Sequence, residues 1–324
     1  MTSLSVIIPF RNRANLLRKT LESISAQEGL ENKSIELILV DNDSNQETVR
    51  MVRKWIEDYG DKLIWANIKL IVEKKIGASI ARNTGFRYSA SPWIAFFDSD
   101  DLMKKNHLGE IISNIQRFPD RDIIYRDVEY HYDGKTRVLR GTRCNLWHDV
   151  ILHSILTTPR HVVTREFFER SGQWNEELLA WNDWELSIRY LINDPKIKHI
   201  SGVPTMTIIS HEDSITGHQR NSLTDKLTHA ISVARKELMS SPHCHKAYLL
   251  DIKEVFLACQ YKKDYKSQKA NEIMDRIIKN SVVKPWFLKM IYRVQSNSRG
   301  YGSLIVLLSG LLNGSLFARK VQNS

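Results

Sequence analysis

Cysteine is scarce in this chain. Three cysteines occur among the 324 residues, Cys144, Cys244 and Cys259. They are far apart and odd in number, so the sequence provides neither a disulfide framework nor a paired-cysteine metal site. Glycine and proline are also few, at 14 and 8 residues, which excludes collagen-like and low-complexity chains. We expect a protein of a reducing compartment.

The N-terminus lacks the long apolar run of a secretory signal. Residues 4–10 are apolar, but this run is too short for a signal-peptide core and has no basic residues before it. We therefore expect a cytoplasmic protein that is not secreted. Hydrophobic residues make up 42% of the chain, enough to fill a core at this length, which excludes a disordered protein.

An excess of positive charge is found at one end only. The net charge is +10, yet residues 226–324 hold 17 Lys and Arg against 6 Asp and Glu, which leaves about −1 for residues 1–225. No nucleic-acid-binding motif accompanies these basic residues, so we expect no nucleic-acid partner. Residues 300–318 are uncharged and carry leucines at helical spacing. They fit either a peripheral helix on an anionic membrane or a helix packed on its own protein.

The first 130 residues alternate short apolar runs with segments of helical period. The predicted strands are residues 4–8, 35–40, 68–72 and 93–97, and the predicted helices lie near 13–27, 46–58, 77–89 and 104–117. Such alternation predicts an α/β protein with a mostly parallel sheet flanked by helices. We expect the region up to residue 225 to extend the same sheet, and residues 226–324 to be a helical C-terminal extension.

Polar residues follow three of the four predicted strands, where open parallel sheets bind their ligands. Asp41 ends the second strand, whereas the nearby Asp43 or Ser44 fits a helix N-cap. The segment 98–101, Asp-Ser-Asp-Asp, brings three carboxylates together after the fourth strand. Such a cluster suits a hard cation that bridges a diphosphate, or else an acidic cap for the helix that follows.

Four tryptophans gather in the middle of the chain, at positions 147, 174, 181 and 184. Sugar rings stack on aromatic faces, so this group fits the lining of a carbohydrate cleft. Tryptophan is also a common core residue, and we expect at least two of the four to lie in the core.

The order of these motifs resembles the inverting family 2 glycosyltransferases of the GT-A fold over residues 4–216. The resemblance rests on segments 5–12, 39–44, 77–85, 97–101 and 171–186, with a late segment at 208–215. It implies a nucleotide-sugar-binding half over residues 1–115 and an acceptor-binding half over 116–225. The basic helical region 226–324 would follow as a third part.

The same resemblance implies roles for single residues. The nucleotide-sugar donor would be bound by Pro9, Arg11, Asn12, Asp41, Arg82, Asn83 and Asp98. Mn²⁺ or Mg²⁺ would be held by Asp98, Asp100 and His211, and Trp174, Trp181 and Trp184 would line the acceptor site. Asp183 would be the catalytic base, with Glu185 in reserve. The chain departs from the family at Asn182, where the family has Glu, and at Arg11, where many relatives have Tyr.

The function implied is transfer of a hexosyl or N-acetylhexosaminyl group from a nucleotide-sugar, with UDP favoured, to a glycan or lipid-linked saccharide. Such a reaction belongs to surface polysaccharide or glycoconjugate synthesis, at the inner face of the cytoplasmic membrane if the basic region binds lipid. Two alternatives remain open. One is a non-catalytic module that binds nucleotide-sugar or anionic lipid. The other is a sugar-phosphate nucleotidyltransferase, although residues 9–12 lack the glycine-rich loop that it would need.

Overall fold

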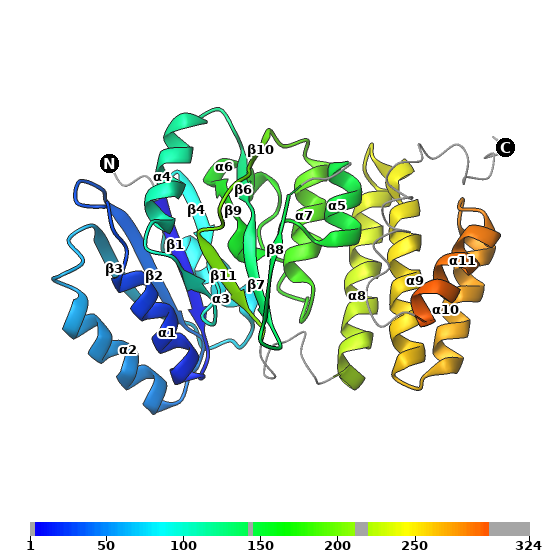
Figure 1. Ribbon diagram of the computed structural model, residues 1–324, viewed down its shortest axis with the longest axis horizontal. Helices are drawn as coiled ribbons and strands as arrows, with labels where there is room; N and C mark the ends of the chain where they lie inside the picture. Colours follow the sequence, from blue (N-terminus) through cyan, green and yellow to red (C-terminus); the bar gives the residue numbers. More distant parts are fainter. Residues whose placement is uncertain (1–3, 142–144, 211–219, 298–324) are drawn as a thin grey trace.

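The computed structural model describes residues 4–141, 145–210 and 220–297, and its main feature is a seven-stranded sheet (Figure 1). The strand order is β10-β6-β9-β4-β1-β2-β3. The strands are β1 (Leu4–Phe10), β2 (Ile35–Asp41), β3 (Ala66–Val72), β4 (Trp93–Phe96), β6 (Ile123–Arg126), β9 (His161–Thr164) and β10 (Ile197–Ile200). Each neighbouring pair is parallel except those of β9, which runs antiparallel to β4 and β6. The predicted mostly parallel sheet is confirmed.

Helices cover both faces of this sheet, and the alternation of side chains along β1 and β2 decides which helix each residue meets. They are α1 (Ala14–Ser25), α2 (Gln46–Tyr59), α3 (Ala78–Arg87), α4 (His107–Arg117), α5 (Leu146–His153), α6 (Arg165–Arg170) and α7 (Asn182–Ile192). Val6 and Ile8 of β1 share a core cluster with residues of α1, α2 and α4. Ile7 shares another with residues of α3, α6 and α7. Strands buried on both faces explain the continuous apolar runs in the sequence.

Helix α3 lies unusually close to the sheet because Gly85 faces β1 and β2. A Cβ at this position would come within 2.4 Å of Ile7 Cγ2 and 3.0 Å of Val40 Cγ2. Real Cβ atoms do not approach other atoms so closely, so only glycine fits here without a shift of Ile7 or of the helix. This close packing places Arg82 and Asn83 of α3 near the carboxyl ends of the strands.

A smaller sheet flanks the main one and was not predicted from the sequence. Its order is β5-β11-β7-β8, with strands β5 (Leu102–Met103), β7 (Val128–Tyr132), β8 (Lys135–Leu139) and β11 (Met206–Ile209). Short 3₁₀ turns, η1 (Thr158–Arg160) and η2 (Cys244–Lys246), complete the connections. Because β5 follows the 98–101 segment directly, this sheet holds that segment against the rest of the domain.

The C-terminal extension is helical, as predicted, and stands beside α5 and α7 at the end of the molecule away from β3 (Figure 1). Its helices are α8 (Arg220–Met239), α9 (Tyr248–Lys263), α10 (Ser267–Asn280) and α11 (Pro285–Asn297). One hydrophobic cluster runs from Tyr125 to Ile291, so it joins α5 and α7 to these four helices. The cluster is thus continuous across residue 225, where we expected a boundary.

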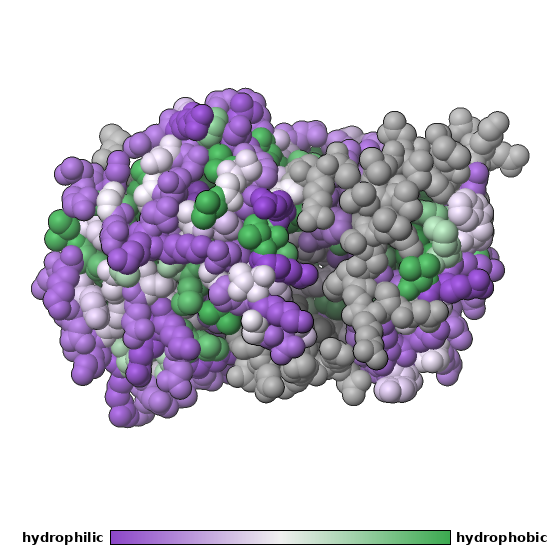
Figure 2. Space-filling model, viewed as in Figure 1, coloured by the Kyte–Doolittle hydropathy of each residue, from purple (hydrophilic) through white to green (hydrophobic). Residues whose placement is uncertain are grey.

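Hydrophilic side chains dominate the coloured part of the surface over the sheet, where hydrophobic residues form small separate patches (Figure 2). Within the ranges that the structure describes, no helix has both the length and the apolar composition needed to cross a membrane. The uncharged stretch 300–318 lies outside the described residues.

Candidate active site

The carboxyl ends of the parallel strands bring the predicted site residues to one edge of the sheet. Asp98, in the loop after β4, accepts a hydrogen bond of 2.5 Å from Arg82 Nη2 of α3. Arg82 is buried, and its guanidinium lies 4.6 Å from the centroid of the Trp174 ring. Its Nε and Nη1 atoms are buried, and they have no hydrogen-bond partner among the residues that the structure describes. Buried guanidinium groups are costly unless they are paired, so these atoms leave donors for a bound anion.

The other two carboxylates of segment 98–101 have different surroundings. Asp100 Oδ2 lies 3.4 Å from Arg13 Nη1, and Arg13 follows β1 in a left-handed conformation. Asp101 is buried and accepts a hydrogen bond from the backbone N–H of Ile209. Neither caps a helix, because α4 begins at His107 with Asn106 as its N-cap residue. The alternative interpretation of this segment as an acidic helix cap is therefore wrong.

These carboxylates repel one another. Burial raises the pKa of Asp98, the Arg82 charge lowers it, and Asp100 and Asp183 raise it again, with an upward shift as the result. The pKa of Asp101 lies well above its usual value, because of burial first and the charges of Asp98 and Asp100 second. A cluster that resists full ionisation in this way is suited to a cation that neutralises it.

Asp183 lies in the first turn of α7 and belongs to the same cluster. Its Oδ1 accepts a 2.8 Å hydrogen bond from the N–H of Trp184, and the N–H of Thr158 also reaches its carboxylate. Burial raises the pKa of Asp183, while the Arg82 charge and the backbone N–H groups oppose the rise without cancelling it. Arg82, Asp98 and Asp183, which are separated by up to 101 positions in the sequence, therefore interact directly through charge.

Two residues near Asp183 in the sequence, Asn182 and Glu185, are engaged in contacts that hold α7 in place. Asn182, where the family carries Glu, donates from Nδ2 to Ser79 Oγ at 3.0 Å and ties the start of α7 to α3. Glu185 is buried and forms an ion pair of 2.7 Å with Arg189. Because this carboxylate is already neutralised away from Asp183, it is poorly placed to act as a reserve base.

The residues expected at the nucleotide on the ends of β1 and β2 form hydrogen bonds within these two loops. Asp41 is buried and its Oδ1 accepts from the N–H of Ser44 at 2.9 Å. Asn12 accepts from the N–H of Asn45, which itself caps α2. These bonds join the loops after β1 and β2 into one surface. Pro9 is buried at the end of β1, and Arg11 is exposed in the loop that follows.

Asn83 is bonded to the segment 174–176. Its amide donates to Trp174 O at 2.9 Å and to Glu176 Oε1 at 3.0 Å, and its oxygen accepts from Trp174 N at 3.1 Å. Both amide hydrogens are therefore used by the 174–176 segment. These bonds let Asn83 position the segment, and its contact with the nucleotide-sugar stays a prediction.

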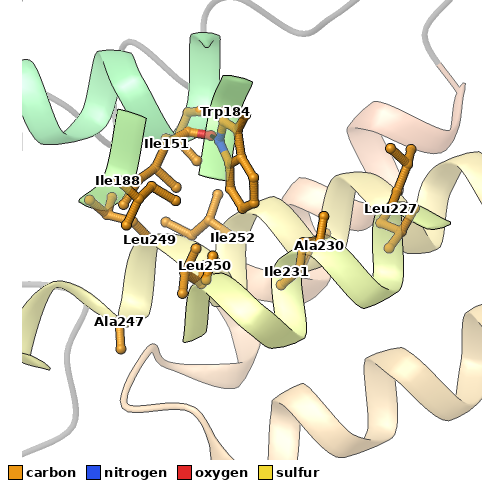
Figure 3. Packing of buried hydrophobic residues seen from close by; sticks show 14 of the residues in the cluster. Ile151, Trp184, Ile188, Leu227, Ala230, Ile231, Ala247, Leu249, Leu250 and Ile252 are labelled. Carbon is orange, nitrogen blue, oxygen red and sulfur yellow. Dashed lines mark hydrogen bonds between the residues drawn. The ribbon is translucent and has the colours of Figure 1, made fainter. Parts of the chain in front are cut away.

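At least two of the four tryptophans lie in the core, as we expected. Trp174 and Trp184 are 2% and 1% exposed. Trp184 donates to Ile151 O and faces the residues of α9 in the hydrophobic cluster (Figure 3). An acceptor ring cannot stack on such side chains, so the predicted acceptor contact is wrong for these two. Trp181 and Trp147 are partly buried at the edge of the cluster, and an acceptor contact at Trp181 remains a prediction.

The predicted metal ligands are only partly described. Asp98 and Asp100 are in place, whereas His211 lies outside the described residues. In the described ranges, no three His, Cys, Asp or Glu side chains are arranged to hold a metal ion by themselves. Magnesium is commonly bound through one or two carboxylates, with substrate phosphates and water as its other ligands. The two carboxylates fit a divalent ion of that kind.

Sequence reasoning missed three contributors to this edge. Arg13 pairs with Asp100, although nothing in the sequence predicts the left-handed turn that carries it. Asn42 links the strand ends, because it donates to Glu73 O and Lys75 O and accepts from Gly77 N. Lys253 of α9, in the C-terminal helices, interacts with Asp183 through charge.

Comparison with known proteins places this geometry in a family. The chain is 31% identical over 139 residues to the poly(ribitol-phosphate) beta-N-acetylglucosaminyltransferase TarP of Staphylococcus aureus, a match that covers 42% of this chain and 39% of TarP. The chain thus spans well under two thirds of this relative. Two solved structures share the fold at low sequence identity. TarS 1–349 of S. aureus in complex with UDP-GlcNAc has a TM-score of 0.61 at 15% identity, covering 91% of this chain and 88% of that one.

The second is the mannosyltransferase PcManGT of Pyrobaculum calidifontis in complex with GDP-Man and Mn²⁺. Its TM-score is 0.57 at 16% identity, and the match covers 95% of this chain and 84% of that one. The expected GT-A architecture is confirmed by these likenesses. A family model described as "Glycosyl transferase family 2" matches residues 5–176, which is more than half of the chain. The chain therefore belongs to glycosyl transferase family 2.

Proposed function

We propose that the chain is an inverting, metal-dependent glycosyltransferase. It moves a hexosyl or N-acetylhexosaminyl group from a UDP-sugar to a saccharide or lipid-linked saccharide in surface polysaccharide or glycoconjugate synthesis. The family supports glycosyl transfer. TarP is named as an N-acetylglucosaminyltransferase, and TarS binds UDP-GlcNAc in its crystals, which favours a UDP-sugar.

The observation that carries this proposal is the interaction of Arg82, Asp98 and Asp183. An inverting transfer needs positive charge beside the departing diphosphate and a base on the opposite side of the reacting carbon. Arg82 offers buried N–H donors, and Asp183 offers a carboxylate. Their proximity at one edge of the sheet provides both groups within a single site.

On the donor side, Arg82 would hold the diphosphate through Nε and Nη1, which have no partner in the described ranges. Asp41 and the loop after β1, with Pro9, Arg11 and Asn12, would receive the nucleoside. The guanidinium plane of Arg11 can stack on a base where many relatives use a tyrosine. Asp98 would orient Arg82 through their ion pair.

The metal site would consist of Asp98 and Asp100, with His211 as a further ligand. PcManGT, which was solved with Mn²⁺, supports the choice of Mn²⁺ or Mg²⁺. When bound, such an ion supplies Lewis-acid stabilisation of the leaving diphosphate. Arg13, which lies 3.4 Å from Asp100, would add a positive charge beside this site.

On the acceptor side, Asp183 would take the proton of the attacking hydroxyl. The acceptor oxygen forms a bond to the anomeric carbon while the bond from that carbon to the diphosphate oxygen breaks, and the bonding electrons leave with UDP. This single displacement inverts the anomeric configuration. The raised pKa of Asp183, which burial causes, makes it a stronger base than an exposed aspartate. Trp181 is the aromatic residue that remains for contact with the acceptor.

Release of nucleotide from a panel of UDP- and other nucleotide-sugars, with Mn²⁺, Mg²⁺ or EDTA, tests the proposal without knowledge of the acceptor. We expect one UDP-sugar to raise the melting temperature and to be hydrolysed slowly. Asp183→Asn should keep donor binding and lower turnover by about 10²–10⁴-fold. Asp100→Ala should weaken both, and Asp58→Asn, on the exposed side of α2, is the matched control.

Full turnover in Asp183→Asn would refute the assignment of the base. Release of pyrophosphate in place of UDP would indicate a nucleotidyltransferase. Binding of a nucleotide-sugar without any turnover, even with added acceptors, would favour a binding module.

We also propose that the basic C-terminal region rests on an anionic membrane surface at the inner face of the cytoplasmic membrane. The net charge of +11 over residues 226–324 supports this, because each Lys or Arg near such a surface contributes about 1 kcal/mol. Co-sedimentation with phosphatidylserine vesicles should occur at low salt and be lost at high salt. Equal binding to neutral vesicles would contradict it.

A further inference from the structure

Lys253 of α9 is a buried cation that the proposed mechanism does not use. Its side chain is 7% exposed, and Nζ lies 4.5 Å from the centroid of the Trp181 ring and 5.5 Å from that of Trp184. Within the described part of the chain, Lys253 Nζ donates one long hydrogen bond, of 3.4 Å, to Leu152 O. A buried ammonium with so little hydrogen bonding is costly unless a negative charge lies near.

That negative charge belongs to Asp183. Burial lowers the pKa of Lys253 to about 8, and the Asp183 carboxylate acts in the opposite direction. Asp183 thus interacts through charge with two cations: Arg82, which belongs to the donor side, and Lys253, which comes from the C-terminal helices. Arg82 is also paired with Asp98.

Lys253 also acts on Asp183 indirectly, through the two tryptophans at the start of α7. Trp181 precedes the helix in a left-handed conformation with φ of 52°, which is unusual for a bulky residue. Its ring and that of Trp184 lie 5.1 Å apart and flank Asn182 and Asp183 in the sequence. A cation over both rings fixes them relative to α9. Figure 3 shows Trp184 beside Ile252, the neighbour of Lys253.

We propose that Lys253 is a positioning residue for Asp183, which holds the first turn of α7 through the two indoles and keeps a positive charge beside the carboxylate. This inference rests on the proposed function, in which Asp183 is the base. Lys253 lies on α9, outside the residues 5–176 that the family model matches. If Lys253 positions Asp183, the C-terminal helices contribute to catalysis as well.

The test compares the variants Lys253→Gln, Lys253→Met and Lys253→Arg in the full chain. Glutamine keeps a donor for Leu152 O but no charge, methionine keeps only the length, and arginine keeps the charge. The readouts are the kcat and KM for UDP release from UDP-N-acetylglucosamine, or from the UDP-sugar that the panel identifies, together with the melting temperature. Lys236→Met, an exposed lysine on the neighbouring helix α8, is the control.

We expect the neutral variants to lose roughly tenfold to a hundredfold in kcat with the donor KM within about twofold, as for a misplaced catalytic group. Lys253→Arg should recover most of the kcat, and Lys236→Met should match the parent protein. A folded Lys253→Gln or Lys253→Met with parental kcat overturns the proposal. Failure of both neutral variants to fold, while Lys253→Arg folds, would make Lys253 a core residue only and also overturn it.

The outcome is separable from that of the proposed function. If Asp183→Asn retains turnover, the base itself is wrong. If Asp183→Asn removes turnover while the neutral Lys253 variants keep it, only the inference about Lys253 fails.

Discussion

Glu36 is a charged residue at the start of the buried strand β2, and its replacement by glutamine is expected to weaken the fold in a pH-dependent way. The carboxylate is 4% exposed and is surrounded by donors. Lys69 Nζ lies 2.7 Å from Oε1, and Oε2 accepts from Ser5 Oγ, from the N–H of Ala90 at 2.8 Å and from Ser91. These bonds tie β1, β2, β3 and the turn before β4 together.

The pKa of Glu36 sets the size of the effect. Burial alone would raise it, but the hydrogen bonds from Lys69, Ser5 and Ala90 outweigh burial and lower the pKa from 4.5 to about 2. A lowered folded-state pKa contributes stability above the unfolded value of 4.5, and that stability is lost as the pH falls towards 2. The full contribution of this pKa shift to the free energy of unfolding is about 3 kcal/mol. It is reduced somewhat because a third of the Lys69 side chain is exposed to solvent. About 1.4 kcal/mol of it is lost by about pH 3.5.

Urea unfolding followed by tryptophan fluorescence at pH 7 and about pH 3.5 measures this contribution. Glu36→Gln should have a lower free energy of unfolding than the parent at pH 7, and the gap should shrink by about 1 kcal/mol at the lower pH. Glu57→Gln, on the exposed side of α2, should show no comparable change. A gap between parent and Glu36→Gln that is equal at both pH values would refute the reasoning.

Three further substitutions test the packing and capping of the helices. Gly85→Ala should lower the free energy of unfolding by about 2 kcal/mol or more, because the new Cβ would collide with Ile7. In Gly109→Ala on α4, the new Cβ would make only an ordinary contact of 3.7 Å, so this variant should be more stable by up to about 1 kcal/mol. A loss of stability equal to that of Gly85→Ala would contradict this explanation. Asn45→Ala removes the bond to Thr48 N that begins α2 and should cost about 1 kcal/mol by urea unfolding, whereas no measurable change would show that this cap contributes nothing.

The strands and helices of the first 130 residues follow from local patterns in the sequence. Parallel strands covered on both faces require continuous apolar runs, and β1 to β4 appear where such runs occur. The gathering of polar residues at one edge also follows, because parallel strands end on the same side. The pairing of Arg82 with Asp98 was not readable in this way, although both residues were assigned to the site.

Features decided by distant contacts escaped the sequence. Strand β9 has four residues and is inserted antiparallel between β4 and β6, a place that no local signal marks. The burial of Trp174 depends on its contacts with Phe96 and Arg82, which are remote in the chain. Lys253 was hidden among the basic residues of the C-terminal region, because composition does not distinguish a buried lysine from an exposed one.

The hydrophobic cluster that joins α7 to the C-terminal helices has a consequence for how this protein can vary. The strand-end loops that would receive the donor pack on other clusters, whereas Trp184 and Ile188 of α7 share theirs with Leu250 and Ile252 of α9. Under the proposed function, substitutions in α9 would therefore alter the acceptor side while the donor side keeps its shape. A truncation at residue 225 would strip the covering from α7 and expose its apolar face to solvent, so a soluble catalytic fragment has to include the helices.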